Sequence, residues 1–241
     1  MSRIDGRQWD KPREVTITPS FQAFPEGSSL ITMGKTKVLC AATIEERVPA
    51  FLRGEGRGWV TAEYSMLPRS TSIRTPRERG ADRVRGRSME IQRLIGRCLR
   101  AITDLPALGE RTVLVDCDVL QADGGTRTAA VTGAYVALYQ ALRVLVEAGV
   151  VSAMPLKCAV AAISVGVVGT EMLLDLCYQE DVRAEIDFNI AITDTGDVVE
   201  VQGATEGSPF PRDILNEIIS LADKGMPDLF QAQQKAITGL M

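Results

Sequence analysis

The chain has 241 residues, and 45% of them are hydrophobic, which is enough to build a large buried core. It contains no histidine, so Ser-His-Asp and Cys-His nucleophilic sites and all histidine-ligated metal sites are excluded. Acid–base chemistry must then come from Asp, Glu, Lys, Tyr or Cys, and any metal is expected to be a hard cation held by carboxylates.

The cysteines and the N-terminus predict a cytoplasmic protein. The N-terminal segment has no apolar signal core. The five cysteines are odd in number, widely spaced and mostly set in apolar runs, which is typical of reduced core residues. They are Cys40, Cys98, Cys117, Cys158 and Cys177.

Short β-strands are predicted in the first third of the chain. Residues Glu14–Thr18 alternate in polarity, and Leu30–Thr43 predicts a hairpin that turns around Gly34. A strand-like run over 59–67 follows the glycine-rich segment Phe51–Gly58. Because no helix follows these glycines, they favour a loop over a cofactor cradle.

An arginine-rich stretch follows, beginning with a predicted long surface loop over Pro68–Arg85. Ten arginines, three carboxylates and no lysine give residues 69–100 a charge of +7 in a chain of net charge −4. This local field favours a polyanionic partner, and arginine without lysine favours bidentate phosphate contacts. The alternative is a solvated, salt-bridged loop. The arginines are Arg69, Arg74, Arg77, Arg79, Arg83, Arg85, Arg87, Arg93, Arg97 and Arg100.

A helix capped by Ser88 is predicted next, since apolar residues recur at helical spacing up to Ile102. Residues Thr112–Leu120 alternate as a strand, and a largely apolar helix is predicted over about Thr128 to Ala148.

Between this strand and this helix lies the turn Gly124–Arg127, with the sequence GGTR. Two glycines, a helix start and an arginine would together make a site for a phosphate-sized anion. An ordinary strand-to-helix turn with an exposed arginine is the alternative.

The second half of the chain predicts more strands and two final helices. The segments are strands over Lys157–Val168, Glu171–Cys177, Ile186–Thr193 and Val198–Gly203, and helices over about Arg212–Lys224 and Asp228–Ile237. Gly225 and Pro227 are expected to separate the two helices. Without a linker or a low-complexity tract, residues 1–241 predict one α+β domain, a two-layer mixed β-sheet with packed helices.

Two groups of carboxylates are candidates for chemistry. Asp116 and Asp118 share one face of a predicted strand, just before Asp123 in the glycine turn. Asp181 and Asp187 are six residues apart; an extended chain would keep both on one side, and a bend between them would bring them closer. With the anion turn, these carboxylates favour a phosphoryl or nucleotidyl transfer enzyme that acts on nucleic acid.

Asp175 interrupts an apolar run, where a buried carboxylate needs a partner. Its expected role is structural, as the partner of a core arginine.

Three motifs resemble the ribonuclease PH family: the segment Gly86–Arg97, the sequence QADGGTRTA over 121–129, and Glu180-Asp181 followed by Asp187-Phe188-Asn189. The resemblance runs over essentially the whole chain and implies the ribonuclease PH-like fold. It also implies a phosphorolytic 3′→5′ exoribonuclease that trims tRNA precursors and other RNA. In this reaction inorganic phosphate attacks the last phosphodiester and releases a nucleoside 5′-diphosphate, reversibly.

The family's functional residues transfer to this sequence by motif. The resemblance implies phosphate binding by Arg87, Gly125, Thr126 and Arg127, and catalysis by Asp181 and Asp187 with Mg²⁺ as their metal. It implies RNA contacts near a subunit interface from Arg69, Arg74 and Arg77, and a homohexamer built as a trimer of dimers. Val182 stands where the family commonly has a serine, which removes a hydrogen-bonding group beside Asp181.

Two rival functions are weighed against this one. The first is a hydrolytic, metal-dependent nuclease that uses Asp116, Asp118 and Asp123. The second is a non-catalytic RNA-binding subunit of a ring. The presence of both aspartates and both phosphate-binding arginines argues against the second.

Overall fold

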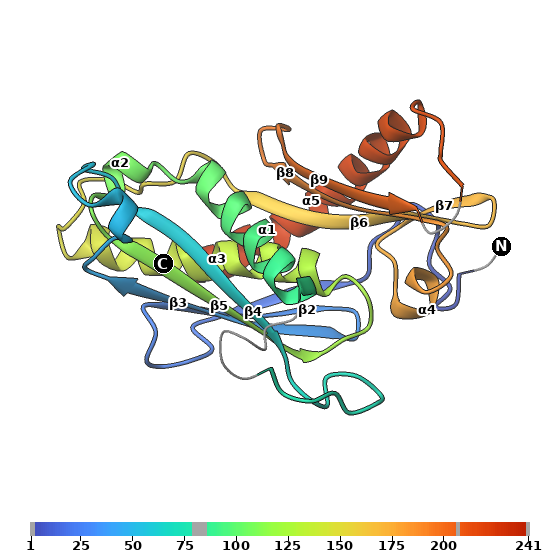
Figure 1. The fold of residues 1–241 in the computed structure, drawn as a ribbon, viewed down its shortest axis with the longest axis horizontal. Coiled ribbons are helices and arrows are strands. Elements are labelled where there is room, and N and C mark those ends of the chain that lie inside the picture. Colours follow the sequence, from blue (N-terminus) through green and yellow to red (C-terminus); the bar gives the residue numbers. More distant parts are fainter. Residues whose placement is uncertain (1–2, 79–85, 206–207, 240–241) are drawn as a thin grey trace.

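The structure is a computed structural model that describes residues 3–78, 86–205 and 208–239. These residues form two β-sheets with helices packed on them, which confirms the predicted α+β class (Figure 1).

The first sheet has five strands in the order β1-β2-β3-β5-β4. Its strands are β1 (Val15–Pro19), β2 (Gly27–Met33), β3 (Thr36–Glu45), β4 (Trp59–Met66) and β5 (Thr112–Gln121). β2 and β3 form the predicted hairpin around Gly34. β4 and β5 run parallel, because α1 (Gly86–Ile102) lies between them in the chain and carries it back along the sheet. Two short helical segments lie between strands of this sheet in the chain: η1 (Ala50–Leu52) between β3 and β4, and α2 (Leu105–Leu108) between α1 and β5.

The second sheet is antiparallel, in the order β7-β6-β8-β9. Its strands are β6 (Val160–Val168), β7 (Glu171–Leu174), β8 (Ile186–Thr193) and β9 (Val198–Thr205). The short helix α4 (Tyr178–Asp181) lies between β7 and β8 in the chain. The predicted strand over Glu171–Cys177 was too long, because Asp175 takes a left-handed conformation (φ 54°) and turns the chain out of the sheet.

Helix α3 (Thr126–Glu147) connects the two halves, since it packs against β2 and β3 of the first sheet and β6 of the second. By length and composition it is apolar enough to cross a membrane, but 72% of its most apolar stretch is buried inside the protein. Its apolar surface is therefore used in the core, as the sequence predicted. The expectation of one continuous domain over residues 1–241 stays a prediction.

Each half has its own hydrophobic core. One core lies between the first sheet and helices α1 and α3 and extends to residues of β6, β8 and α5 (Ile214–Thr238), and the other lies between the second sheet and α5. All five cysteines are free, as predicted, and four of them are buried.

The prediction of two final helices was wrong, because α5 is continuous and contains Pro227. Pro227 itself is exposed, whereas Gly225, Met226 and Leu229 around it are buried against the second sheet. A methyl group on Gly225 would lie 2.5 Å from the Ile163 side chain. Burial of this face outweighs the hydrogen bond that a proline removes from a helix interior.

Two further expectations changed at helix starts. α1 begins at Gly86, so Ser88 lies inside its first turn and donates a hydrogen bond to Glu78 (3.1 Å) instead of capping the helix. α3 begins at Thr126, two residues earlier than expected. In the predicted loop over Pro68–Arg85, residues 68–78 are irregular, and Arg79, Arg83 and Arg85 lie outside the described residues.

Candidate active site

The turn Gly124–Arg127 has the geometry that an anion site needs. Gly124 (φ 75°) and Gly125 (φ 63°) both adopt left-handed conformations, which glycine tolerates without strain. Gly125 is the N-cap residue of α3, so Thr126 and Arg127 occupy the first helical turn. The first amide groups of a helix have no partner within the helix and carry its positive dipole end. They are therefore available to a phosphate-sized anion.

Two side chains from the N-terminal third of the chain form hydrogen bonds with the backbone of this turn. The Thr36 hydroxyl donates to the Gly124 carbonyl (2.7 Å) and accepts a hydrogen bond from the Asp123 amide (2.9 Å). The Arg13 guanidinium donates to the carbonyls of Asp123 (2.5 Å) and Gly124 (3.4 Å). Both were missed in the sequence, because neither lies in or near the motif.

Arg127 and Arg87 come from the first turns of two helices that pack together, α3 and α1. Arg127 lies 3.6 Å from Glu90 of α1, which orients its guanidinium toward that helix. Tyr64 of β4 lies beneath them, with its hydroxyl 2.8 Å from the Thr126 hydroxyl. Burial raises the pKa of Tyr64, and the hydrogen bond to Thr126 and the charges of the two arginines oppose that rise.

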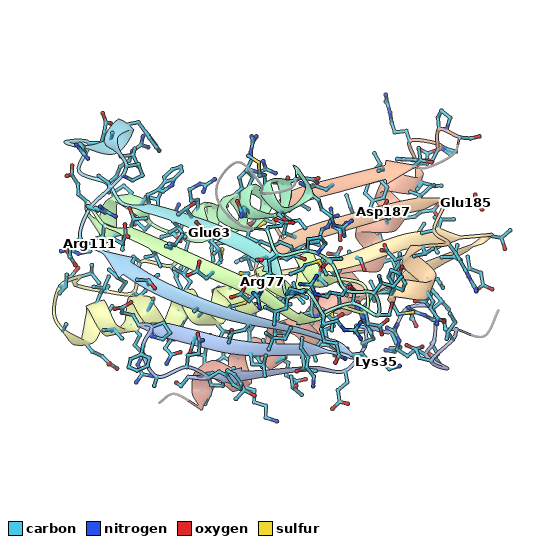
Figure 2. The ribbon with its side chains drawn as sticks, turned by 60° about the horizontal axis from the view of Figure 1, so that its bottom comes forward. Lys35, Glu63, Arg77, Arg111, Glu185 and Asp187 are labelled. Carbon is cyan, nitrogen blue, oxygen red and sulfur yellow. The ribbon has the colours of Figure 1, made fainter. Side chains whose placement is uncertain are left out.

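Asp181 and Asp187 complete the cluster. Asp181 is the last residue of α4 and Asp187 lies at the start of β8, so the irregular residues 182–185 form the bend that was one of the two expected arrangements. Burial raises the pKa of Asp181, and so does the nearby carboxylate of Asp187, while Arg87, Arg127 and Arg13 lower it. Figure 2 shows Asp187 on the second sheet, whereas the arginines come from helices packed on the first. The site therefore lies where the two halves meet.

The N-terminal segment fixes α4. Arg3 is buried and donates to both carboxylate oxygens of Glu180, at 2.9 and 2.7 Å. Burial opposes ionisation of Glu180, but Arg3 and the Cys177 amide hold its pKa below the ordinary value. Asp175, fully buried, is paired with Arg13, which confirms the expected structural role. Val182 follows α4 and is 66% exposed.

The predicted RNA-binding arginines lie together on one segment of the chain. Arg69, Arg74 and Arg77 are exposed on the segment that follows β4. Arg77 lies over the first sheet (Figure 2). There burial raises the pKa of Asp118 and the charge of Arg77 lowers it.

The carboxylates of the rival nuclease do not form a metal site. Burial raises the pKa of Asp116, as do Glu63 and Asp118 beside it on the first sheet. Within the described ranges, no group of three or more His, Cys, Asp or Glu side chains could hold a metal ion.

Sequence comparisons cover nearly the whole chain. The model described as the 3′ exoribonuclease family, domain 1, matches residues 11–143, and that for domain 2 of the same family matches residues 158–225. The ribonuclease PH of Dehalococcoides mccartyi is 54% identical, over 99% of this chain and 98% of its own. That of Syntrophomonas wolfei is 53% identical over 100% of both chains.

Solved structures show the same fold at low identity. A chain of the Archaeoglobus fulgidus exosome with RNA bound to the active site matches with a TM-score of 0.77 and 22% identity, over 97% of this chain and 91% of that one. A chain of an archaeal exosome core gives 0.75 and 22%, over 98% and 91%.

Identity of this level over nearly the whole length of both chains shows the activity of this chain, which is that of a phosphate-dependent 3′→5′ exoribonuclease. The chain belongs to the 3′ exoribonuclease family, as a bacterial ribonuclease PH.

Proposed function

We propose that Arg87, Gly125, Thr126 and Arg127 hold inorganic phosphate, and that Asp181 and Asp187 carry out catalysis at the 3′ end of RNA. The observation that supports this assignment is the surroundings of Asp181. Its pKa is raised by burial and by Asp187, and it is lowered by Arg87 and Arg127. Two cations and two carboxylates from four separate elements therefore meet beside a helix start.

The turn and the arginines would bind the attacking group. Inorganic phosphate is largely ionised near neutral pH, because the second pKa of phosphate monoesters is about 6. No histidine base is then needed to activate it. The two guanidinium groups and the amides at the start of α3 orient the anion for in-line attack and offset the charge that builds up on the transferring group.

The reaction exchanges one phosphorus–oxygen bond for another. An oxygen of inorganic phosphate bonds to the phosphorus of the last internucleotide linkage, and the bond from that phosphorus to the 3′ oxygen breaks. A nucleoside 5′-diphosphate leaves, and the shortened RNA takes up a proton on its new 3′ oxygen. Asp181 can hold such a proton, because its pKa is raised.

The pair Asp181 and Asp187 also fits Mg²⁺. This ion is commonly bound by one or two carboxylates and completes its shell with water and substrate phosphate oxygens. When bound, it would supply positive charge at the reacting phosphate and the 3′ oxygen.

For the substrate, we propose tRNA precursors and other RNA 3′ ends, including those of rRNA, in the cytoplasm. Arg69, Arg74 and Arg77 would bind the RNA backbone. Exposed on the segment that follows β4, they would serve the active site of a neighbouring subunit in a homohexamer, a trimer of dimers. The exposure of all three arginines supports this arrangement. Mixing Asp187→Asn subunits with subunits lacking these arginines should then restore part of the activity, because some sites become complete.

The phosphate requirement tests the proposed reaction. RNA with a 3′ extension is incubated with the enzyme and Mg²⁺, with and without inorganic phosphate, and the released nucleotides are identified. Nucleoside diphosphates that appear only with phosphate support the proposal. Nucleoside monophosphates released without phosphate would establish the hydrolytic alternative, and binding without any release would establish the non-catalytic one.

A further inference from the structure

Arg13 binds the anion-binding turn and also Asp175, which lies six residues before Asp181 in the chain. Its Nη1 and Nη2 atoms donate to the carbonyls of Asp123 and Gly124 in the anion-binding turn. Its Nε and Nη2 atoms also donate to the two carboxylate oxygens of Asp175, at 2.8 and 2.6 Å. The side chain is 5% exposed, so it has little contact with solvent.

Asp175 connects Arg13 to the chain segment that leads into α4 and Asp181. Its carboxylate accepts a further hydrogen bond from the Arg13 amide (2.7 Å), and its own amide donates to the Ser164 carbonyl (2.7 Å). Its carbonyl accepts from Arg3 (2.9 Å) and Arg7 (3.1 Å). Together these bonds hold Asp175 in its left-handed backbone conformation, which is costly for a residue other than glycine. Six residues later the chain reaches Asp181.

The two segments also touch directly. A Cβ atom on Gly124 would lie 2.5 Å from the Leu176 carbonyl oxygen and 2.8 Å from the Tyr178 amide, at the start of α4. A Cβ atom on Gly125 would lie 2.8 Å from the Arg13 guanidinium. Because the backbone of the turn is in contact with the backbone at the start of α4, a movement of the turn would change its position relative to α4.

We propose that Arg13 is a positioning residue for phosphorolysis: paired with Asp175, its guanidinium sets the anion-binding turn against the helix that carries Asp181. Arg13 acts through the turn and not on the substrate. The inference rests on the proposed function, since it takes the turn as the phosphate site and Asp181 as catalytic. Arginine is required because a planar fork can hold two carbonyls and a carboxylate together, whereas a lysine ammonium cannot span them.

The test compares how the variant Arg13→Lys, which keeps the charge, changes the KM for phosphate and the KM for RNA. The KM for phosphate at saturating RNA should rise roughly tenfold to a hundredfold, as expected when a reactant is misplaced by about 1 Å, while the KM for RNA changes little. Binding of inorganic phosphate, measured by calorimetry without RNA, should weaken by the same factor. Arg111→Lys is the control, because Arg111 is also paired with a carboxylate, through its Nε atom and Glu46 (2.8 Å), but at the far end of the first sheet (Figure 2).

Three results would overturn the inference or its basis. A folded Arg13→Lys with the wild-type phosphate KM overturns it, and so does an equal change in both KM values, which is the mark of a merely structural role. Asp175→Asn keeps the shape of the side chain and goes through the same assays, so the test stands if Arg13→Lys fails to fold. Arg127→Ala is run alongside, and an unchanged phosphate KM there would overturn the proposed phosphate site instead.

Discussion

Asp181 and Asp187 form one electrostatic unit, although Asp181 ends α4 and Asp187 lies in β8. Burial raises the pKa of Asp181, the charge of Asp187 raises it further, and three arginines oppose both. The raised pKa of Asp181 suits this residue to hold a proton, and the neighbouring carboxylate of Asp187 makes the pair suited to a metal ion.

Replacing Asp187 with asparagine should affect both chemistry and titration. We expect phosphorolysis to fall by about 10²- to 10⁴-fold, which is typical for the loss of an acid–base or metal-binding group. Without the neighbouring charge, the pKa of Asp181 should move down toward its ordinary value, which carboxyl NMR without divalent metal would show. Asp223→Asn, on the exposed side of α5, should change neither. Intact phosphorolysis in Asp187→Asn would remove the catalytic assignment.

The variant Asp181→Asn should be inactive but more stable than the wild-type protein at neutral pH. The pKa of Asp181 is raised in the folded state, so its contribution to stability is present below the ordinary pKa and is lost as pH rises through the raised one. Asparagine avoids this loss. The gain in the free energy of unfolding, from urea titrations, should therefore be larger at pH 7 than at pH 4. A gain that is independent of pH would show that charge is not its source.

Arg127→Ala should weaken phosphate binding without unfolding the protein. Hydrogen bonds to charged groups contribute about 1.5–3 kcal/mol, so the phosphate KM should rise by roughly 10- to 100-fold. Arg143 of the same helix is a matched control, because it is also paired with a glutamate, Glu147 (2.6 Å). Steady-state rates over a range of phosphate concentrations measure both variants. Equal phosphate KM values for the two would rule out the turn as the phosphate site.

Tyr64→Phe tests the support beneath the turn. The Tyr64 hydroxyl is buried and lies 2.8 Å from the Thr126 hydroxyl, so its loss should cost about 1 kcal/mol of stability. Because Thr126 is then free to rotate, the phosphate KM should rise several-fold, less than in Arg127→Ala. Tyr139→Phe, a half-buried tyrosine of the same core, is the control. A loss of stability with an unchanged phosphate KM would limit Tyr64 to packing.

The sequence predicted the local elements of the site well, because local rules determine them. Alternating polarity identified β5, and glycines before a helical pattern identified the turn that opens α3. Likewise, a carboxylate in an apolar run indicated that Asp175 needs a buried arginine. Each of these inferences depends on fewer than about 20 neighbouring residues, which is the range over which periodicity and turn chemistry act.

Contacts between distant segments were beyond that reach. Arg13, Thr36 and Tyr64 contact the turn from at least 110, 87 and 62 residues away in the sequence, and no spacing rule connects such positions. The same limit explains α5, where a proline predicted a break that burial of the neighbouring residues prevents. Tertiary packing decides such cases, and the sequence alone does not show which face a helix will bury.

Pro227→Ala measures how strongly packing holds α5 together. Pro227 is exposed, so its replacement removes few contacts, restores a helical hydrogen-bond donor and raises helix propensity. Part of this gain is offset by the greater freedom of the unfolded chain, so the free energy of unfolding should rise by about 2 kcal/mol. Gln231→Ala, exposed on the same helix, should change stability by less than about 0.5 kcal/mol. If Pro227→Ala is instead destabilising, the proline bends α5 so that Gly225 can approach Ile163, and packing depends on that bend.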